Sequence, residues 1–366
     1  MESIQKPPLY EVALNLSPNE LNSLCRTNKR FAEICNSEYF WLEKRIRDFD
    51  LKEFLDQTDY SNKEKYKILY FRWKQSGSLY GWGANHNGLL TNPDVNLIEQ
   101  PINILPNVSS IFKVISYGES WTSRGYGIYI LTYDCNLFVL GYNTYTDEIS
   151  NKPVFLMNNV FDIFISNDED LYILDFNYNI IEYKNKQTIW STKNARKLIF
   201  GVHSNNMYVI TLKNQLYMFS ERKWKNIKNT RSDILDFVEC GMNSYYLFDN
   251  NELQIHNDYD GKHYFKRDIF SVSCNISGRY YIDTNKILWN SNDIKIDDNV
   301  IKFVTANSEN EFMYSKSDGK IILTYTGNII NQDLVPEDYY VYNIANAKAI
   351  LHIARLRDLF LAIVKE

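Results

Sequence analysis

The feature of this sequence that most constrains its fold is a strand pattern that occurs seven times along the chain. The clearest copy is residues 79–90, where an apolar strand begins at Leu79 and leads into a turn containing Gly83 and Gly88. The later copies keep mainly the apolar alternation, and their leading residues are Leu137, Ile180, Leu216, Leu253, Ile287 and Ile321. The leading residues lie 58, 43, 36, 37, 34 and 34 positions apart, and periods of roughly 20–50 residues are typical of repeat architectures.

Two further strands precede the repeated strand in each unit. Residues 112–116 and 126–131 precede Leu137, and residues 236–240 and 245–248 precede Leu253. Short polar turns separate the second strand from the third, as β-hairpins require. Several short strands in each of seven units predict a mainly β fold, a seven-bladed β-propeller over residues 78–335. The two long first intervals predict surface insertions around residues 91–107 and 142–153, and Trp82 is predicted to lie in a blade core.

The first copy resembles the repeat of the regulator-of-chromosome-condensation family, whose fold is a seven-bladed propeller. The family pattern is roughly Leu-Tyr-x-Trp-Gly-x-Asn-x-x-Gly-x-Leu, and residues 79–90 match its seven specified positions. The resemblance covers roughly residues 78–330 and is carried more by spacing than by identity. It implies one function for the chain, that of a guanine-nucleotide exchange factor for a small GTPase.

The segment before the repeats has helical periodicity and is predicted to form a separate domain, residues 1–74. Ser17-Pro18-Asn19-Glu20 predicts a helix start, with an N-cap serine, a proline at the first helical position and an acidic residue near the positive end. Apolar residues three or four apart continue to Ile46, and a further amphipathic helix is predicted over residues 61–74. Residues 75–78 have the composition of a linker.

The order of motifs in this domain resembles an F-box. Residues 7–9 (Pro-Pro-Leu), 16–21 (Leu-Ser-Pro-Asn-Glu-Leu), 25–31 and the pair Phe40-Trp41 follow one another in the family order. Residues 10–15 are shorter than the first helix of the family. Similar starts occur in proteins of large DNA viruses of amoebae, and the abundance of Asn and Tyr agrees with that resemblance.

The F-box resemblance implies a Skp-type adaptor of a cullin ubiquitin ligase as partner, and an unidentified protein substrate on the propeller. Apolar anchors at helical spacing suit docking into a partner's groove. The implied adaptor-binding residues are Pro8, Leu9, Leu14, Leu16, Leu21, Leu24, Phe31, Ile34, Phe40 and Trp41. The same residues are also compatible with a helical cap that has no partner, and the chain would then be a propeller scaffold with a degenerate F-box.

The C-terminal residues 336–366 are predicted to contain an amphipathic helix from Ala345 to Lys365. Apolar residues at helical spacing define its stripe, which is formed by Ile350, Ile353, Leu356, Phe360 and Ile363. An amphipathic helix usually buries such a stripe in its own protein.

Charge and cysteine content restrict partners and location. The net charge is −5 and no basic cluster stands out, which argues against nucleic-acid binding. The five cysteines have no short-spaced pair, which predicts free thiols in a reducing compartment. No apolar run reaches the roughly 20 residues of a membrane span, and residues 1–8 lack the apolar core of a signal peptide. We therefore expect a cytoplasmic or nuclear protein of the host cell that is neither secreted nor membrane-spanning.

Catalytic motifs are absent from the sequence. The five histidines have no metal-ligand spacing, and no Cys-x-x-Cys pair is present. Neither a nucleophile elbow nor a phosphate-binding loop occurs, and the acidic run Asp168-Glu169-Asp170 is interpreted as a solvated hairpin tip. The sequence predicts a non-enzymatic interaction protein without a cofactor or a metal.

Overall fold

The chain divides into two compact units, Met1–Gln75 and Ser76–Glu366. The computed structural model describes residues 8–49, 65–85, 88–90, 95–106, 110–119, 125–166, 170–191, 195–201, 206–211, 213–220, 223–227, 233–240, 243–257, 259, 261–274, 279–290, 293–305, 311–325, 340–344, 347–356 and 359–365. The acidic run at residues 168–170 lies outside the described residues except for Asp170.

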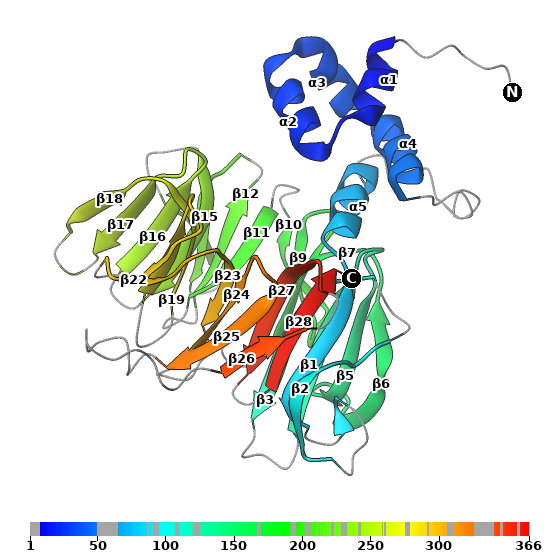
Figure 1. Ribbon diagram of the computed structural model, residues 1–366, viewed down its shortest axis with the longest axis vertical. Helices are drawn as coiled ribbons and strands as arrows, with labels where there is room; N and C mark the ends of the chain where they lie inside the picture. Colours follow the sequence, from blue (N-terminus) through cyan, green and yellow to red (C-terminus); the bar gives the residue numbers. More distant parts are fainter. Residues whose placement is uncertain are drawn as a thin grey trace, which may run out of the picture. The chain divides into compact units, whose positions relative to one another are not determined.

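The first unit is helical, as the sequence predicts (Figure 1). Its helices are α1 (Pro8–Asn15), α2 (Pro18–Thr27), α3 (Lys29–Cys35), α4 (Glu38–Phe49) and α5 (Lys65–Lys74). α5 occupies the described part of the helix predicted over residues 61–74, because residues 61–64 lie outside the described residues.

The second unit is a seven-bladed β-propeller, which confirms the predicted fold. Each blade is a four-stranded antiparallel sheet, and we number the blades along the chain. Blade 1 contains β1 (Ser78–Ala84), β2 (Leu97–Asn103), β27 (Ala349–Leu356) and β28 (Leu359–Lys365). Blade 2 contains β3 (Ile111–Glu119), β4 (Gly125–Thr132), β5 (Leu137–Asn143) and β6 (Glu148–Met157). Blade 3 contains β7 (Val160–Ile165), β8 (Leu171–Asp175), β9 (Asn179–Glu182) and β10 (Gln187–Ser191).

The remaining four blades follow the same strand order. Blade 4 contains β11 (Ala195–Phe200), β12 (Met207–Thr211), β13 (Leu216–Ser220) and β14 (Lys223–Asn226). Blade 5 contains β15 (Ile234–Cys240), β16 (Asn243–Phe248), β17 (Leu253–Asn257) and β18 (His263–Lys266). Blade 6 contains β19 (Ile269–Cys274), β20 (Arg279–Asp283), β21 (Leu288–Asn290) and β22 (Lys295–Asp297). Blade 7 contains β23 (Val300–Thr305), β24 (Glu311–Lys316), β25 (Lys320–Tyr325) and β26 (Tyr340–Asn343).

The two ends of the propeller sequence close the ring in blade 1. The C-terminal strand β28 pairs antiparallel with β1 over Ser78–Gly83, and Figure 1 shows the red C-terminal strands beside the cyan first strand. The first strands of neighbouring blades contact one another in the cyclic order β27, β3, β7, β11, β15, β19, β23 and back to β27. These seven strands therefore form a closed ring at the centre of the propeller.

The predicted C-terminal helix is wrong, because residues 349–356 form the strand β27 and residues 359–365 form the strand β28. β28 is buried on both faces: Leu359, Leu361 and Ile363 belong to the core between blades 1 and 2. The intervening Phe360, Ala362 and Val364 belong to the core between blades 7 and 1. Such a strand shows no polar alternation from which a strand could be predicted.

A β-bulge explains why β27 resembles a helix in sequence. Its pairing with β28 shifts register between Ile350 and His352. Ile350 and Ile353 consequently face the same core, although they are three residues apart. A bulge inserts one extra residue into a strand, so the period of two locally becomes three, which is also the spacing of one helical face.

The apolar core is divided among the interfaces between blades. Cluster members come from neighbouring blades in each case, and Trp82 belongs to the core between blades 7 and 1, where it stacks on Phe360. Trp82 is 1% exposed, so its predicted burial is confirmed, although its partners are in the neighbouring blade as well as its own. The predicted insertions are wrong in part, because residues 97–103 form β2 and residues 148–157 form β6.

The six hairpins between second and third strands share one backbone conformation. Each has a residue of positive φ one or two positions before the repeated strand: Cys135, Tyr178, Asn214, Asn251, Lys286 and Gly319. Five of these six residues are not glycine, so the left-handed turn is kept without it; asparagine adopts this conformation at less cost than most residues.

The first strands of all seven blades also share a local irregularity. Register shifts occur near their starts, for example between Ile111 and Lys113 in β3 and between Ala195 and Lys197 in β11. At two places in the described chain, the residue after the shift joins neighbouring blades through an ion pair. Lys113 Nζ lies 2.7 Å from the Asp162 carboxylate, and Lys197 Nζ lies 2.7 Å from the Asp236 carboxylate. These ion pairs connect blade 2 to blade 3 and blade 4 to blade 5.

Candidate docking site

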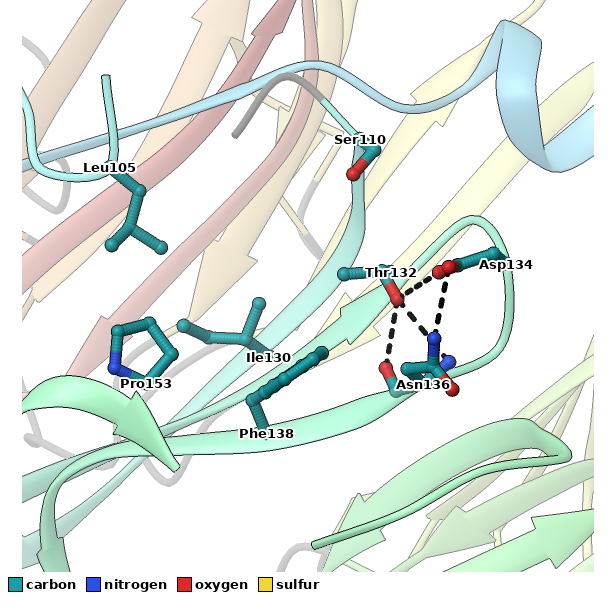
Figure 2. Close-up of a pocket in the computed structure, with 8 residues that line it drawn as sticks. All are labelled: Leu105, Ser110, Ile130, Thr132, Asp134, Asn136, Phe138 and Pro153. Atoms are coloured by element: carbon teal, nitrogen blue, oxygen red, sulfur yellow. Dashed lines mark hydrogen bonds between the residues drawn. The ribbon is translucent and has the colours of Figure 1, made fainter. Parts of the chain in front are cut away.

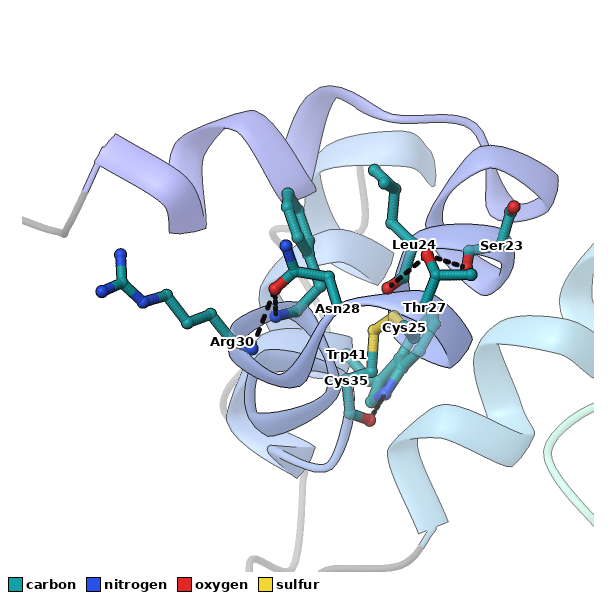
Figure 3. Close-up of a disulfide and its surroundings, with 9 residues drawn as sticks. Ser23, Leu24, Cys25, Thr27, Asn28, Arg30, Cys35 and Trp41 are labelled. Atoms are coloured by element: carbon teal, nitrogen blue, oxygen red, sulfur yellow. Dashed lines mark hydrogen bonds between the residues drawn. A yellow bond between two sulfur atoms is a disulfide. The ribbon is translucent and has the colours of Figure 1, made fainter.

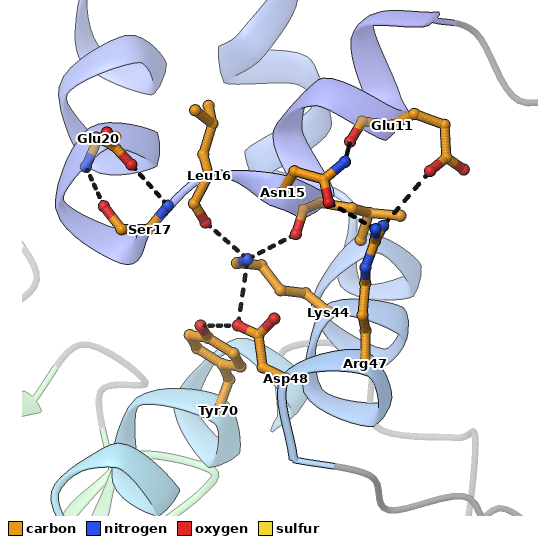
Figure 4. Close-up of polar contacts among 10 residues, drawn as sticks. Glu11, Asn15, Leu16, Ser17, Glu20, Lys44, Arg47, Asp48 and Tyr70 are labelled. Atoms are coloured by element: carbon orange, nitrogen blue, oxygen red, sulfur yellow. Dashed lines mark hydrogen bonds and ion pairs between the residues drawn. The ribbon is translucent and has the colours of Figure 1, made fainter.

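The start of α2 is fixed by the capping that the sequence predicts. Ser17 is the N-cap and Pro18 lies at the start of the helix. The Glu20 N–H donates to Ser17 Oγ, and the Ser17 N–H donates to Glu20 Oε2 at 2.8 Å, as Figure 4 shows. The two hydrogen bonds form a capping box, and those with Ser17 lower the pKa of the Glu20 carboxyl. The box sets where α2 begins relative to Leu16.

Local side-chain to backbone bonds also define α3 and its join to α4. Asn28 Oδ1 accepts from the Arg30 and Phe31 N–H groups and caps α3. The Trp41 indole N–H donates to the Cys35 carbonyl at 2.7 Å, so the end of α3 is attached to α4 (Figure 3). Trp41 thereby has a buried polar partner as well as an apolar environment.

Five of the ten predicted adaptor-binding residues lie inside the core of the helical unit. They are 0–7% exposed and comprise Leu14, Leu21, Phe31, Phe40 and Trp41. Phe40 and Trp41 pack edge to face, with their ring centroids 5.2 Å apart. Tyr70 of α5 lies against Trp41 at 5.4 Å. Residues this deeply buried stabilise the unit and have no surface left for a partner.

The other five predicted residues retain accessible surface. Leu9, Leu16, Leu24 and Ile34 are partly buried and pack against the core, and Pro8 is exposed. We call these five residues, Pro8, Leu9, Leu16, Leu24 and Ile34, the candidate docking set. They come from α1, the turn after it, α2 and α3. Val12 of α1, which the sequence analysis did not select, is 50% exposed and adds further apolar surface.

A buried lysine organises the turn between α1 and α2. Lys44 is 1% exposed, and its ammonium donates to the Leu14 and Leu16 carbonyls at 3.0 and 2.9 Å (Figure 4). These are carbonyls at the end of α1, which lack helical partners. Asp48 lies 3.2 Å from the same ammonium and balances its charge. The buried cation is therefore paired and hydrogen-bonded, as burial of a charge requires.

The network continues into α5. The Tyr70 hydroxyl donates to Asp48 Oδ2 at 2.5 Å, and burial together with this bond raises the pKa of the Tyr70 phenol. Sequence reasoning missed Lys44, Asp48 and this role of Tyr70. A signal was available for Lys44, because it lies four residues after Phe40 and three after Trp41 and so shares the buried face of α4.

Two cysteines of the helical unit are paired, so the prediction of free thiols is wrong for them. Cys25 and Cys35 form a disulfide, with Cα atoms 6.2 Å apart (Figure 3). Ten residues separate them in sequence, but the turn between α2 and α3 returns the chain and brings the two side chains together. Cys135 and Cys240 of the propeller are buried and do not belong to a disulfide.

Among the described residues, no three His, Cys, Asp or Glu side chains are placed to hold a metal ion. No helix in the described part of the chain is long and apolar enough to cross a membrane.

Comparison with known proteins identifies the propeller fold. Prp20p from Saccharomyces cerevisiae, described with its binding properties to Gsp1p and histones, matches with a TM-score of 0.53 at 10% identity, over 80% of this chain and 92% of Prp20p. Yeast RCC1 (Prp20) in a complex with Kap60 matches with a TM-score of 0.53 at 11% identity, over 80% and 90% of the two chains. Human WBSCR16 matches with a TM-score of 0.53 at 8% identity, over 79% and 100%.

At these identities the likeness establishes a shared fold, the seven-bladed propeller similar to RCC1. No protein-family model matches the chain, and no curated protein matches it. The F-box and viral resemblances therefore stay predictions from the sequence.

Proposed function

We propose that the chain is a non-enzymatic interaction subunit whose helical unit docks a Skp-type adaptor of a cullin ubiquitin ligase. In this proposal the propeller presents a protein substrate. The observation that carries the proposal is the division of the ten F-box-like residues into a buried half and an accessible half. Such a division is what a docking module needs, because an anchor that fills its own core cannot also fill a groove.

Hydrogen bonds at the ends of α1 and α2 hold part of the accessible half in place. Lys44 fixes the carbonyls of Leu14 and Leu16, and the capping box fixes the start of α2 immediately afterwards. Leu16 is therefore held between two hydrogen-bonded helix ends. Anchors that are already ordered lose less conformational entropy on binding, which favours affinity.

The propeller half of the proposal is supported by the fold. Prp20p, which shares the fold, was described together with its binding to Gsp1p and histones. A closed ring of blades carries large exposed surfaces on a rigid frame, and rigid frames suit the presentation of a partner. Fold alone does not determine which partner is bound.

The test uses the full chain and a purified Skp-type adaptor in isothermal titration calorimetry. Leu16→Ala and Leu24→Ala are each expected to weaken binding by about 30-fold or more, the effect of losing an anchor worth about 2 kcal/mol. Phe270→Ala is the matched control, because Phe270 is 59% exposed on the propeller and its loss should leave adaptor binding unchanged. Circular dichroism of each variant verifies that the helices are intact.

Leu21→Ala is unsuitable as a docking variant because Leu21 is 0% exposed, and its truncation would act by destabilising the unit. Absence of wild-type binding at micromolar adaptor would contradict the ligase proposal. Faster nucleotide release from a small GTPase, with no adaptor binding, would instead favour the exchange-factor alternative.

A further inference from the structure

A pocket of about 220 Å³ opens between blade 1 and blade 2. Its apolar end is formed by Leu105, Ile130, Phe138 and Pro153 (Figure 2). Leu105 and Phe138 also pack against the core between these blades, so the pocket is the place where that core is left open. Pockets for small-molecule ligands usually measure about 300–1,000 Å³, and this one is closer in size to a single large side chain.

The other end of the pocket is polar and carries one carboxylate. Thr132, Asp134 and Asn136 come together there in the β4–β5 hairpin (Figure 2). The Thr132 hydroxyl donates to Asp134 Oδ1, and Asn136 Nδ2 donates to Asp134 Oδ2 at 2.9 Å. Each carboxylate oxygen can accept about two hydrogen bonds. Asp134 is therefore held in one orientation and keeps acceptor capacity on both oxygens.

The hairpin itself does not require a carboxylate at this position. Three of the equivalent hairpins have asparagine one residue before the left-handed turn residue, at Asn177, Asn250 and Asn285. In blade 2 the closure of the turn rests on Thr132, whose hydroxyl oxygen accepts from the Asn136 N–H at 3.3 Å. The negative charge of Asp134 is thus available for recognition.

An accessible strand edge runs beside the pocket. β6 is the outermost strand of blade 2, and none of the described strands pairs with its outer edge. Pro153, which lines the pocket, belongs to β6, and the next residues Val154 and Phe155 are 42% and 54% exposed. An open edge strand offers backbone groups to an extended peptide, and exposed apolar side chains beside it add contact area.

We propose that this site binds an extended segment of a partner protein that lies along β6 and inserts an arginine or lysine side chain into the pocket. The apolar end would contact the aliphatic stem, and Asp134 would accept hydrogen bonds from the charged head. Both halves of such a side chain match the pocket, since basic side chains combine an apolar stem with a charged tip. Asp134 accepts one bond at each oxygen already, and its remaining lone pairs suit the two parallel N–H donors of a guanidinium.

This proposal deepens the proposed function by naming the surface on which the propeller would hold its substrate. It rests on the interaction role of the propeller but not on adaptor docking, because the pocket lies wholly in the second unit. Asp134→Asn should leave adaptor titrations unchanged, and Leu24→Ala should leave the pocket unchanged. The two proposals can therefore fail separately.

The first experiment probes the pocket with n-butylguanidinium, which copies the arginine head and stem, and with n-butylurea, a neutral analogue of similar shape. Methyl-labelled full-length protein is titrated and followed by the NMR shifts of Leu105 and Ile130. We expect saturable shifts with butylguanidinium at millimolar concentration and binding at least about tenfold weaker for butylurea, because its N–H donors carry no positive charge to pair with the Asp134 carboxylate. Equal binding of the two probes, or no saturable shift with butylguanidinium, would overturn the proposal.

Asp134→Asn and Asp318→Asn form the matched pair of variants. Asp318 occupies the same turn position in the β24–β25 hairpin, and its side chain is 47% exposed. Asp134→Asn is expected to weaken butylguanidinium binding about tenfold, whereas Asp318→Asn should have no effect. Equal losses in the two variants would overturn the assignment to Asp134.

The strand-pairing part has its own test. A synthetic peptide with one arginine between flanking Thr-Val pairs should bind more tightly than butylguanidinium, because it adds backbone bonds to β6. If the peptide binds no better than the fragment, the edge of β6 is not used and this part of the proposal is wrong.

Discussion

Replacing Leu361 by alanine tests the closure of the propeller directly. Leu361 is 0% exposed and belongs to the core between blades 1 and 2, with Leu79 and Ile111. Removing a buried leucine side chain to alanine costs about 2–5 kcal/mol, a large fraction of the roughly 5–15 kcal/mol that stabilises a typical domain. If residues 345–365 formed the predicted helix, Leu361 would lie outside its apolar stripe. Replacing Leu361 by alanine would then change the free energy of unfolding little.

The assay is urea unfolding of the full chain, followed by tryptophan fluorescence and circular dichroism. Phe270→Ala is the control, because Phe270 is 59% exposed and exposed substitutions usually change stability by less than about 0.5 kcal/mol. A Leu361→Ala protein with the unfolding midpoint of the wild type would refute both the strand assignment of residues 359–365 and the burial argument built on it.

Three further outcomes follow from the turns, the cysteines and the buried tyrosines. Lys286→Gly should raise the free energy of unfolding by up to about 1 kcal/mol, because Lys286 has φ 64° and glycine adopts that conformation without strain; urea titration measures it. Denatured, non-reduced protein should show two fewer reactive thiols than reduced protein, since Cys25 and Cys35 are paired; thiol titration before and after reduction measures the difference. Burial raises the pKa of Tyr280 to about 12, above the unfolded value of about 10. Between about pH 10 and 12 the unfolded state loses the Tyr280 proton while the folded state keeps it. The contribution of this phenol to the free energy of unfolding is therefore complete below pH 10 and is lost between about pH 10 and 12. Absorbance at 295 nm and circular dichroism should change together in this range.

The repeat could be predicted from sequence because the third strand of each blade is half-apolar and follows a tight turn. When the strands of each blade are counted outward from the centre of the ring, all seven leading residues lie in the third strand or directly beside it. Examples are Leu137 in β5 and Leu253 in β17. The hairpin before that strand keeps a residue of positive φ even where that residue is not glycine, for example Tyr178 and Asn214. This backbone geometry therefore persists without a glycine that would signal it in the sequence.

The C-terminal strands could not be predicted by periodicity. β28 faces two cores and is apolar throughout, and the bulge of β27 gives Ile350 and Ile353 a spacing of three. The burial of β28 on both faces depends on long-range closure, because β1 pairs with β28 across almost the entire propeller sequence. Local sequence patterns contain no information on that pairing. The requirement that a propeller ring must close does contain it, because the two ends of the propeller sequence must then meet in one blade.

The candidate site was predictable as a set of residues but not as a surface. Helical spacing selects apolar residues on one side of each helix, yet it does not reveal which of them a later helix will cover. Leu21 and Leu24 are three residues apart on α2, and only Leu21 is completely buried. The difference depends on the neighbouring helices and on the Lys44 bonds that hold the end of α1. A docking anchor must combine an apolar side chain with exposed area, so Leu24 meets the requirement and Leu21 does not, although the sequence pattern treats them alike.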